Sequence, residues 1–239
     1  MRKLGILAAF VFAFVPAVNA DILNSALPSA PGSGGGMGPY LDEYQLDDGA
    51  SENSVGLTSG GELAWMNTFT VNPGEDVITD ISVTFGTPQF PGSSGIQPGD
   101  TVHLYLWSGT PTGTYNLLWE GSGTVDASAI ELDQLQHFAV PNVDVGDPGD
   151  PFFFGVSINH SAGFYPASLD QTIPPGPGRS YVCGSNTPDG FDPNNLNGGI
   201  GLYDVNDLFP GAWLVRASAI PEPGSLLLLG LGVLALRRR

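Results

Sequence analysis

The chain has 239 residues, of which 34 are glycine, 21 are proline and only 13% are charged. This abundance of residues that break helices excludes a helical bundle, a coiled coil and a doubly wound α/β fold. Hydrophobic residues make up 41% of the chain, which is enough to build a core and excludes disorder throughout. The composition therefore favours an all-β domain with many turns.

The charge is distributed unevenly along the chain. The formal net charge is −17, and five of the seven Lys and Arg residues lie at the two ends. Residues 21–220 contain two cations, Arg179 and Arg216, against 23 of the 24 acidic residues, a formal charge of −21. A surface this anionic repels the phosphate backbone of nucleic acids, so nucleic-acid binding is excluded.

Residues 1–20 have the pattern of a secretory signal peptide. They begin Met-Arg-Lys, continue with an apolar run over residues 4–15 and end in Val-Asn-Ala. The apolar run is too short for a comfortable membrane span, and the small residues predict cleavage after Ala20. Residues 21–39, which follow, are rich in Gly, Pro and Ser and have the composition of a flexible arm.

Residues 40–219 form the body, in which apolar and polar residues alternate with a period of two. Turn-forming Pro, Gly and Asn residues separate these runs, which is typical of short antiparallel strands. We therefore predict a single-domain antiparallel β-sandwich, jelly-roll-like, with a short helix at most over residues 128–135. The clearest alternating runs are Leu63–Val71, Val77–Phe85, Val102–Leu106, Phe152–Ile158 and Trp213–Ala217.

Residues 220–239 form a tail of three parts. The Pro-Glu-Pro sequence leaves an extended strip of backbone that an enzyme can grip. The apolar stretch spans only about 17 Å as a helix, against a hydrocarbon core of about 30 Å, and the terminal arginines favour the cytoplasmic side. The three parts are Pro221, Glu222 and Pro223; the stretch that includes Leu226, Leu229 and Leu236; and Arg237, Arg238 and Arg239.

This tail resembles the PEP-CTERM sorting signal in the order and spacing of all three parts. The resemblance implies an exported protein of Gram-negative bacteria that make exopolysaccharide. It also implies recognition by an exosortase, a membrane transpeptidase that supplies the nucleophile itself. We therefore expect transient anchoring in the inner membrane, cleavage near Pro-Glu-Pro, and release or transfer to the cell surface or extracellular matrix.

The body shows a looser resemblance to a β-sandwich domain of exported bacterial surface proteins. Residues 47–49, 62–69 and 212–217 carry it. The resemblance supports the fold and an extracellular role, and it implies no activity.

Two acidic loops suggest calcium as a ligand. Carboxylate oxygens on flexible loops suit Ca²⁺, and extracellular calcium would occupy even a weak site. The alternative is that these residues simply make turns, and the spacing does not match an EF-hand loop. The candidate ligands are Asp144, Asp147 and Asp150 in one loop, and Asp189 and Asp192 in the other.

Trp107 and Trp119 are candidates for stacking against sugar rings, and core packing is the alternative for both. No motif of a hydrolase, metalloenzyme or nucleophile elbow is present, so we expect no enzymatic activity. The sequence favours an exosortase-sorted surface or matrix protein with a structural or adhesive body. The alternatives are a carbohydrate-binding module, which calcium would stabilise, and then a secreted hydrolase.

Overall fold

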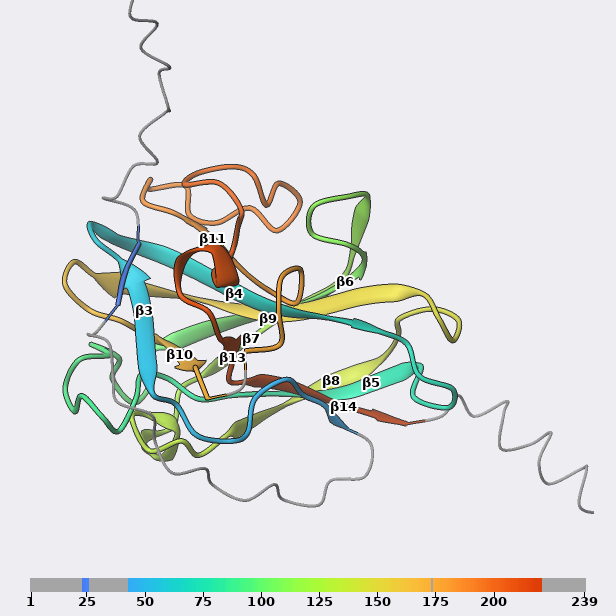
Figure 1. Cartoon of the computed structure of the whole chain (residues 1–239), viewed down its shortest axis with the longest axis horizontal. Helices are drawn as coiled ribbons and strands as arrows, with labels where there is room; N and C mark the ends of the chain where they lie inside the picture. Colours follow the sequence, from blue (N-terminus) through green and yellow to red (C-terminus); the bar gives the residue numbers. More distant parts are fainter. Residues whose placement is uncertain (1–22, 26–42, 173, 221–239) are drawn as a thin grey trace, which may run out of the picture.

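A computed structural model describes residues 23–25, 43–172 and 174–220 (Figure 1). The predicted signal peptide, the Pro-Glu-Pro sequence and the apolar and arginine parts of the tail lie outside these residues. Within them, no helix is both long and apolar enough to cross a membrane.

The described residues form three antiparallel sheets, as Figure 1 shows. The largest has six strands in the order β12 (Tyr203–Asp204), β11 (Ser180–Ser185), β4 (Gly60–Thr70), β9 (Pro151–Ser161), β6 (Thr101–Gly109) and β7 (Tyr115–Thr124). The second has the order β2 (Glu43–Tyr44), β14 (Val215–Ile220), β5 (Val77–Val83) and β8 (Gln136–Asp144). The third has the order β1 (Leu23–Ser25), β3 (Asn53–Leu57), β10 (Ala167–Asp170) and β13 (Ala212–Trp213).

The main core lies between the six-stranded sheet and the two smaller sheets. Alternation along each strand points every second side chain inward, so the apolar residues of the facing sheets meet. Fully burying one large apolar side chain stabilises a fold by about 1.5–3 kcal/mol. The core includes Leu63, Trp65, Leu104, Phe154, Val156 and Ile158 from the large sheet, and Ile78, Ile81, Val83, Leu169, Trp213 and Val215 from the others.

Asn67 interrupts the apolar alternation of β4, and the structure shows why. Its side chain is fully buried, and its amide donates to the backbone oxygens of Trp213 at 2.9 Å and Val215 at 3.2 Å. Its Oδ1 accepts a hydrogen bond from Ser180 Oγ at 2.7 Å. Because a buried amide needs partners, this residue ties β4 to β11, β13 and β14 at defined positions.

The outer face of the six-stranded sheet is covered as well, by the loop of residues 186–202. Leu196 of this loop is buried, and Phe191 and Leu202 pack beside it. Glu62 holds the loop down, since its carboxylate accepts hydrogen bonds from the Phe191 N–H at 2.8 Å and from Ser157 Oγ. The residues that this loop covers are Ala64, Met66, Tyr105, Trp107, Phe153, Tyr181 and Cys183.

The predicted all-β, antiparallel, single-domain class is confirmed. Two local predictions differ. Residues 23–25, placed in a flexible arm, form strand β1, which pairs with Val55–Leu57 of β3. The proposed helix over residues 128–135 is only a 3₁₀ turn, η1 (Ala127–Ala129), and the described α-helix is the single turn α1 (Val205–Leu208).

Candidate functional site

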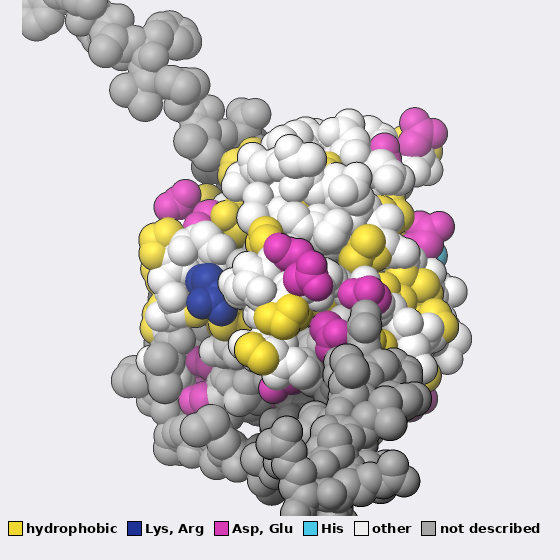
Figure 2. Space-filling model, turned by 90° about the vertical axis from the view of Figure 1, so that its right-hand side faces the viewer, with side chains coloured by type: hydrophobic (Ala, Val, Ile, Leu, Met, Phe, Trp, Pro, Cys, Tyr) yellow, Lys and Arg dark blue, Asp and Glu magenta, His cyan; other side chains and the backbone are white. Residues whose placement is uncertain are grey.

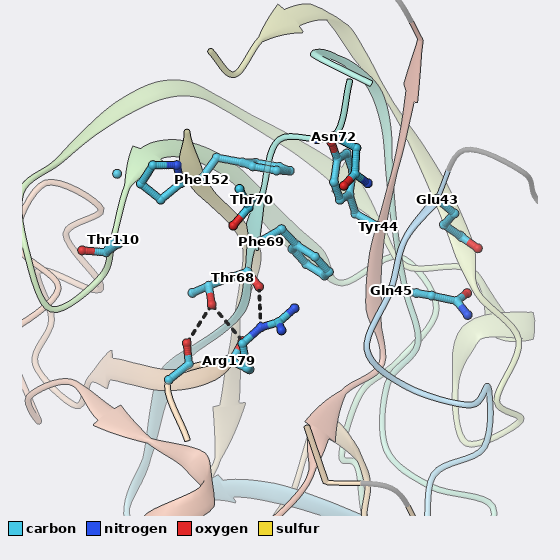
Figure 3. Close-up of a pocket in the computed structure, with 13 residues that line it drawn as sticks. Glu43, Tyr44, Gln45, Thr68, Phe69, Thr70, Asn72, Thr110, Phe152 and Arg179 are labelled. Carbon is cyan, nitrogen blue, oxygen red and sulfur yellow. Dashed lines mark hydrogen bonds between the residues drawn. The ribbon is translucent and has the colours of Figure 1, made fainter. Parts of the chain in front are cut away.

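An open groove of about 550 Å³, which we call the Arg179 groove, lies on the described surface (Figure 3). Its volume lies in the range of small-ligand sites. Five segments converge on it: β2, the end of β4, the β6–β7 turn, the start of β9 and the approach to β11. The lining residues are Glu43, Tyr44, Gln45, Thr68, Phe69, Thr70, Asn72, Gly109, Thr110, Pro151, Phe152, Gly178 and Arg179.

Three aromatic side chains form the floor of the Arg179 groove. The Tyr44 ring meets Phe69 and Phe152 edge-on, with centroids 5.4 and 4.8 Å apart. Phe69 stacks in parallel on Phe154 of the core at 5.2 Å. The Tyr44 hydroxyl donates to Glu75 O at 2.8 Å and accepts from Asn72 N at 2.9 Å, so the floor is anchored to the β4–β5 turn. Packing of this kind makes the floor rigid.

Arg179 lies over the aromatic floor. Its guanidinium carbon is 5.7 Å from the centroid of the Phe69 ring, and its Nε donates to Thr68 O at 3.2 Å (Figure 3). Neither guanidinium η-nitrogen has a hydrogen bond to a residue of the described chain, and no described carboxylate lies within ion-pair distance. The two η-nitrogens therefore remain available as hydrogen-bond donors.

Arg216 is the other cation in the described residues, and its environment is the opposite. Its side chain is only 10% exposed, and it donates to both carboxylate oxygens of Asp47 and to Glu43 Oε2 at 3.3 Å. Burial opposes its charge, but the hydrogen bonds and charges of Asp47 and Glu43 prevail and raise the pKa of Arg216. Burial raises the pKa of Glu43, although Arg216 opposes that shift. The Glu43 carboxylate, at the wall of the groove, is thus paired with Arg216.

Acidic side chains are scattered over this end of the molecule. Figure 2 shows Asp and Glu side chains around a small group of Lys and Arg atoms. Within the part of the chain that the structure describes, the Arg179 groove carries a positive charge without an acidic partner, because Glu43, the acidic residue in its lining, is paired with Arg216.

Hydroxyl groups border the positive charge. Thr70 and Thr110 line the groove and are exposed, and neither hydroxyl has a hydrogen-bond partner among the described residues. Thr68 differs, since its hydroxyl donates to Gly178 O at 2.8 Å and holds the segment that carries Arg179. The Asn72 amide donates to Glu75.

The structure corrects the placement of the two predicted stacking residues. Trp107 is fully buried beneath the loop of residues 186–202, stacks on Phe153 at 4.7 Å and donates from Nε1 to Pro193 O at 2.9 Å. Trp119 is half-buried and packs against the main core. A register shift opposite Leu106 and Trp107 leaves Leu118 as an extra residue in β7 and turns Trp119 inward. Neither ring forms an exposed platform for a sugar.

The predicted calcium ligands do not come together. Asp144 accepts from Gly146 N, Asp150 from Asp147 N, and Asp192 from Asn194 N, so these carboxylates close turns. Asp189 is exposed in the loop of residues 186–202. Across residues 23–25, 43–172 and 174–220, no three His, Cys, Asp or Glu side chains are placed to hold a metal ion.

Two further acidic features have structural explanations. Asp170 is fully buried and accepts hydrogen bonds from the N–H groups of Asp48 and Thr172, each at 2.7 Å. Burial, together with the charges of Asp48 and Glu52, raises the pKa of Asp170 to about 7.

A second hollow of about 380 Å³ contains Glu131, whose carboxylate accepts hydrogen bonds from Gly92 N and Ser94 N. Both carboxylates therefore serve to fix loops.

The sequence pattern does not mark the residues of the Arg179 groove as a site. The one sequence feature that points to this site is Arg179 itself, because it is one of two cations in the acidic residues 21–220. Phe69 and Phe152 belong to alternating apolar runs that indicate core packing, and Tyr44 lies in an acidic stretch, so the pattern does not reveal that the three residues line a groove.

Comparison with known proteins identifies the tail. Residues 219–239 match the PEP-CTERM protein-sorting motif. The chain therefore carries the address of an exported protein that an exosortase recognises and that is anchored transiently before release. The predicted sorting residues Pro221, Glu222 and Pro223 lie within the match.

The body itself has weaker counterparts. No curated protein sequence matches the chain. Among solved structures, a clostridial cysteine protease, Cwp84 after propeptide cleavage, aligns with 14% identity and a TM-score of 0.44. The alignment covers 78% of this chain and 42% of the protease, so the chain spans less than half of that protein. A likeness this weak carries no argument about activity.

Proposed function

We propose that this protein acts at the cell surface or in the exopolysaccharide matrix, with a structural or adhesive β-sandwich body. The observation that carries the proposal is the junction between body and tail. The sorting-motif match begins at residue 219, and Ala219 and Ile220 are the last two residues of β14. The last strand of the folded body is thus joined directly to the sorting motif.

The character of the body supports this role. Two apolar clusters, one on each side of the six-stranded sheet, stabilise it without a disulfide, since the chain has one cysteine, Cys183, which is buried. Burial raises the pKa of the Cys183 thiol, so it stays protonated and inert. The acidic surface keeps such a module soluble outside the cell. We propose no enzymatic activity for it.

Fractionation of cells that produce the full chain tests the proposal. Wild-type protein is expected in the surface and matrix fractions. A variant with Pro221, Glu222 and Pro223 all changed to alanine is expected to stay in the inner membrane. The role of the body is tested by replacing residues 40–219 with an unrelated β-sandwich of similar size and charge. Unchanged matrix cohesion or cell adhesion after that exchange would refute a specific role for this body.

Saccharide binding is a second candidate function, and the Arg179 groove is the observation that favours it. The groove combines the partly exposed ring of Phe69, exposed hydroxyls and a guanidinium that has no acidic partner among the described residues, and these groups can contact a sugar. It replaces Trp107 and Trp119 as the candidate surface. Retention of the mature protein on immobilised polysaccharide, and its loss when Thr70 and Thr110 are both changed to bulky residues, would support this function. Equal retention of the two proteins would refute it.

A further inference from the structure

We propose that the Arg179 groove recognises an acidic saccharide, with the guanidinium of Arg179 donating two hydrogen bonds to the carboxylate of a uronate-type sugar. The proposal rests on saccharide binding as the second candidate function and deepens it by naming the class of sugar. Four structural features support it, and a fifth determines how binding should depend on salt.

The first feature is the contrast between the two cations. In a body with a formal charge of −21, most cations would be expected to have acidic neighbours, and Arg216 does have two. Arg179 has no such neighbour within 4.0 Å among the described residues. Since Glu43 is paired with Arg216, the lining of the groove keeps one positive charge for a ligand.

The second feature is preorganisation. Arg179 is held at Nε by Thr68 O and rests over the Phe69 ring, so the side chain loses little freedom when it binds. A guanidinium fixed at Nε presents its η-nitrogens as a fork that matches a carboxylate. The charge-assisted hydrogen bonds of such a pair are stronger than those of a neutral sugar hydroxyl.

The third feature is the set of groups beside the charge. A uronate ring carries hydroxyls next to its carboxylate and apolar C–H faces above and below. The exposed hydroxyls of Thr70 and Thr110 have capacity to bind the sugar hydroxyls. The apolar surfaces of Pro151 and of the Phe69 edge can receive the C–H face of the ring. A simple inorganic anion would use the charge alone.

The fourth feature is the shape of the site. The Arg179 groove is open to solvent and not enclosed. An open groove allows a polymer to enter and leave along its length, whereas an enclosed pocket accepts only a chain end. The ligand expected is therefore a stretch within an acidic polysaccharide.

The fifth feature is the surrounding field. The acidic surface repels a polyanion at long range, so binding needs the local charge of Arg179. This repulsion is least screened at low ionic strength, where binding should therefore be weak. Moderate salt screens this repulsion more effectively than it weakens a partly buried ion pair at close range. We expect affinity to pass through a maximum with salt concentration, which distinguishes this site from an ordinary basic patch.

The test measures binding of the full mature protein to polygalacturonate in a buffer with EDTA, so that calcium cannot bridge two polyanions. Fully methyl-esterified polygalacturonate is the matched ligand, because it keeps the sugar backbone and removes the charge. Arg179→Gln removes the cation and Arg179→Lys keeps it. Asn116→Ala, at an exposed position of β7 that is not part of the groove lining, is the control variant.

We expect Arg179→Gln to weaken binding by about tenfold to a hundredfold, in line with a lost charged hydrogen bond. The affinity of Arg179→Lys should lie between those of the wild type and of Arg179→Gln. The affinity of Asn116→Ala should match that of the wild type. Removing either partner of the ion pair should have the same effect. The wild type should therefore bind the methyl ester as weakly as Arg179→Gln binds the free acid. Melting curves of each variant establish that all are folded.

Two results overturn the inference in distinguishable ways. Equal binding of the acid and its ester, or unchanged binding by Arg179→Gln, would refute recognition of the carboxylate and leave saccharide binding standing. Absence of binding to both polymers in the folded wild-type protein would refute saccharide binding by the groove as well.

Discussion

Ile220, the last residue of β14, pairs with Val77 at the start of β5 (Figure 1). The sorting sequence Pro221-Glu222-Pro223 follows at once, so strand and sorting motif have no linker between them. Six residue steps join Ile220 to Leu226, where the apolar stretch begins, and they span at most about 21 Å. The anchored body is therefore held close to the membrane while the exosortase acts.

This junction predicts that the folded body slows its own processing. A transpeptidase must grip extended backbone around its cleavage site, and the residues just before Pro221 are bound in a sheet. A four-residue Gly-Ser insertion between Ile220 and Pro221 should accelerate conversion to the mature form. Pulse labelling followed by mass analysis measures the rate.

The control is the same insertion after Gly163, an exposed loop position where an added Cβ meets nothing within 4 Å. It should leave the processing rate unchanged. If both insertions behave like the wild type, the end of β14 does not limit exosortase access.

Arg216 should be a critical residue for stability. Changing Arg216→Met leaves Asp47, whose side chain is fully buried, and Glu43, whose side chain is 5% exposed, without their cation. The loss should be about 3–5 kcal/mol of unfolding free energy, measured by urea denaturation. Replacing Glu43 and Asp47 by leucine as well should recover much of it. Arg179→Met, the matched change at the partly exposed cation, should cost no more than about 1 kcal/mol.

Trp107 should contribute to stability and not to ligand binding. Its ring is buried between Phe153, Tyr105 and the loop of residues 186–202. Trp107→Ala should lower the unfolding free energy by about 3–5 kcal/mol, whereas Leu118→Ala at a position 40% exposed should have little effect. If the folded Trp107→Ala protein loses as much saccharide affinity as Arg179→Gln does, this assignment is contradicted.

His160 should make stability depend on pH. Its Nε2 accepts a hydrogen bond from Leu57 N at 3.1 Å, which requires the neutral ring, and burial lowers the pKa of His160. A depressed histidine pKa means that the stabilisation is present above the ordinary value of about 6.5 and is lost as the pH falls through the folded-state pKa. Urea midpoints should therefore decrease on acidification from pH 7.

His160→Gln keeps an acceptor and removes the titration, so the difference between wild type and variant isolates this residue. Asp170 acts with the opposite sign: its raised pKa adds stability at low pH that is lost as the pH rises toward about 7. A difference curve for His160→Gln that is flat between about pH 5 and pH 7 would contradict the role of the Leu57 contact.

Strands with one apolar and one polar face can be predicted well from the sequence. The alternation of Val102, Leu104 and Leu106 places them in the main core, as observed. The same alternation points Tyr105 and Phe153 away from that core, yet a second cluster buries them. The covering loop is rich in Asp, Asn, Pro and Gly, which indicates turns and gives no sign that it packs on a sheet.

The candidate site is harder to predict because it is assembled from segments far apart in the chain. Tyr44, Thr110 and Arg179 meet through the pairing of β2 with β14, of β6 with β9, and of β9 and β11 with β4. No spacing in the sequence encodes that meeting. By contrast, the sorting motif is contiguous, so the order of its residues along the chain is enough to identify them.

The most direct test of the central claim is mass spectrometry of the mature protein's C-terminus, taken from the membrane, surface and matrix fractions of the producing cells. If the chain is an exosortase substrate, the full tail should occur only in the membrane fraction. Surface and matrix protein should end near Pro221, Glu222 and Pro223. An intact Arg239 on protein from the surface or matrix would contradict the account.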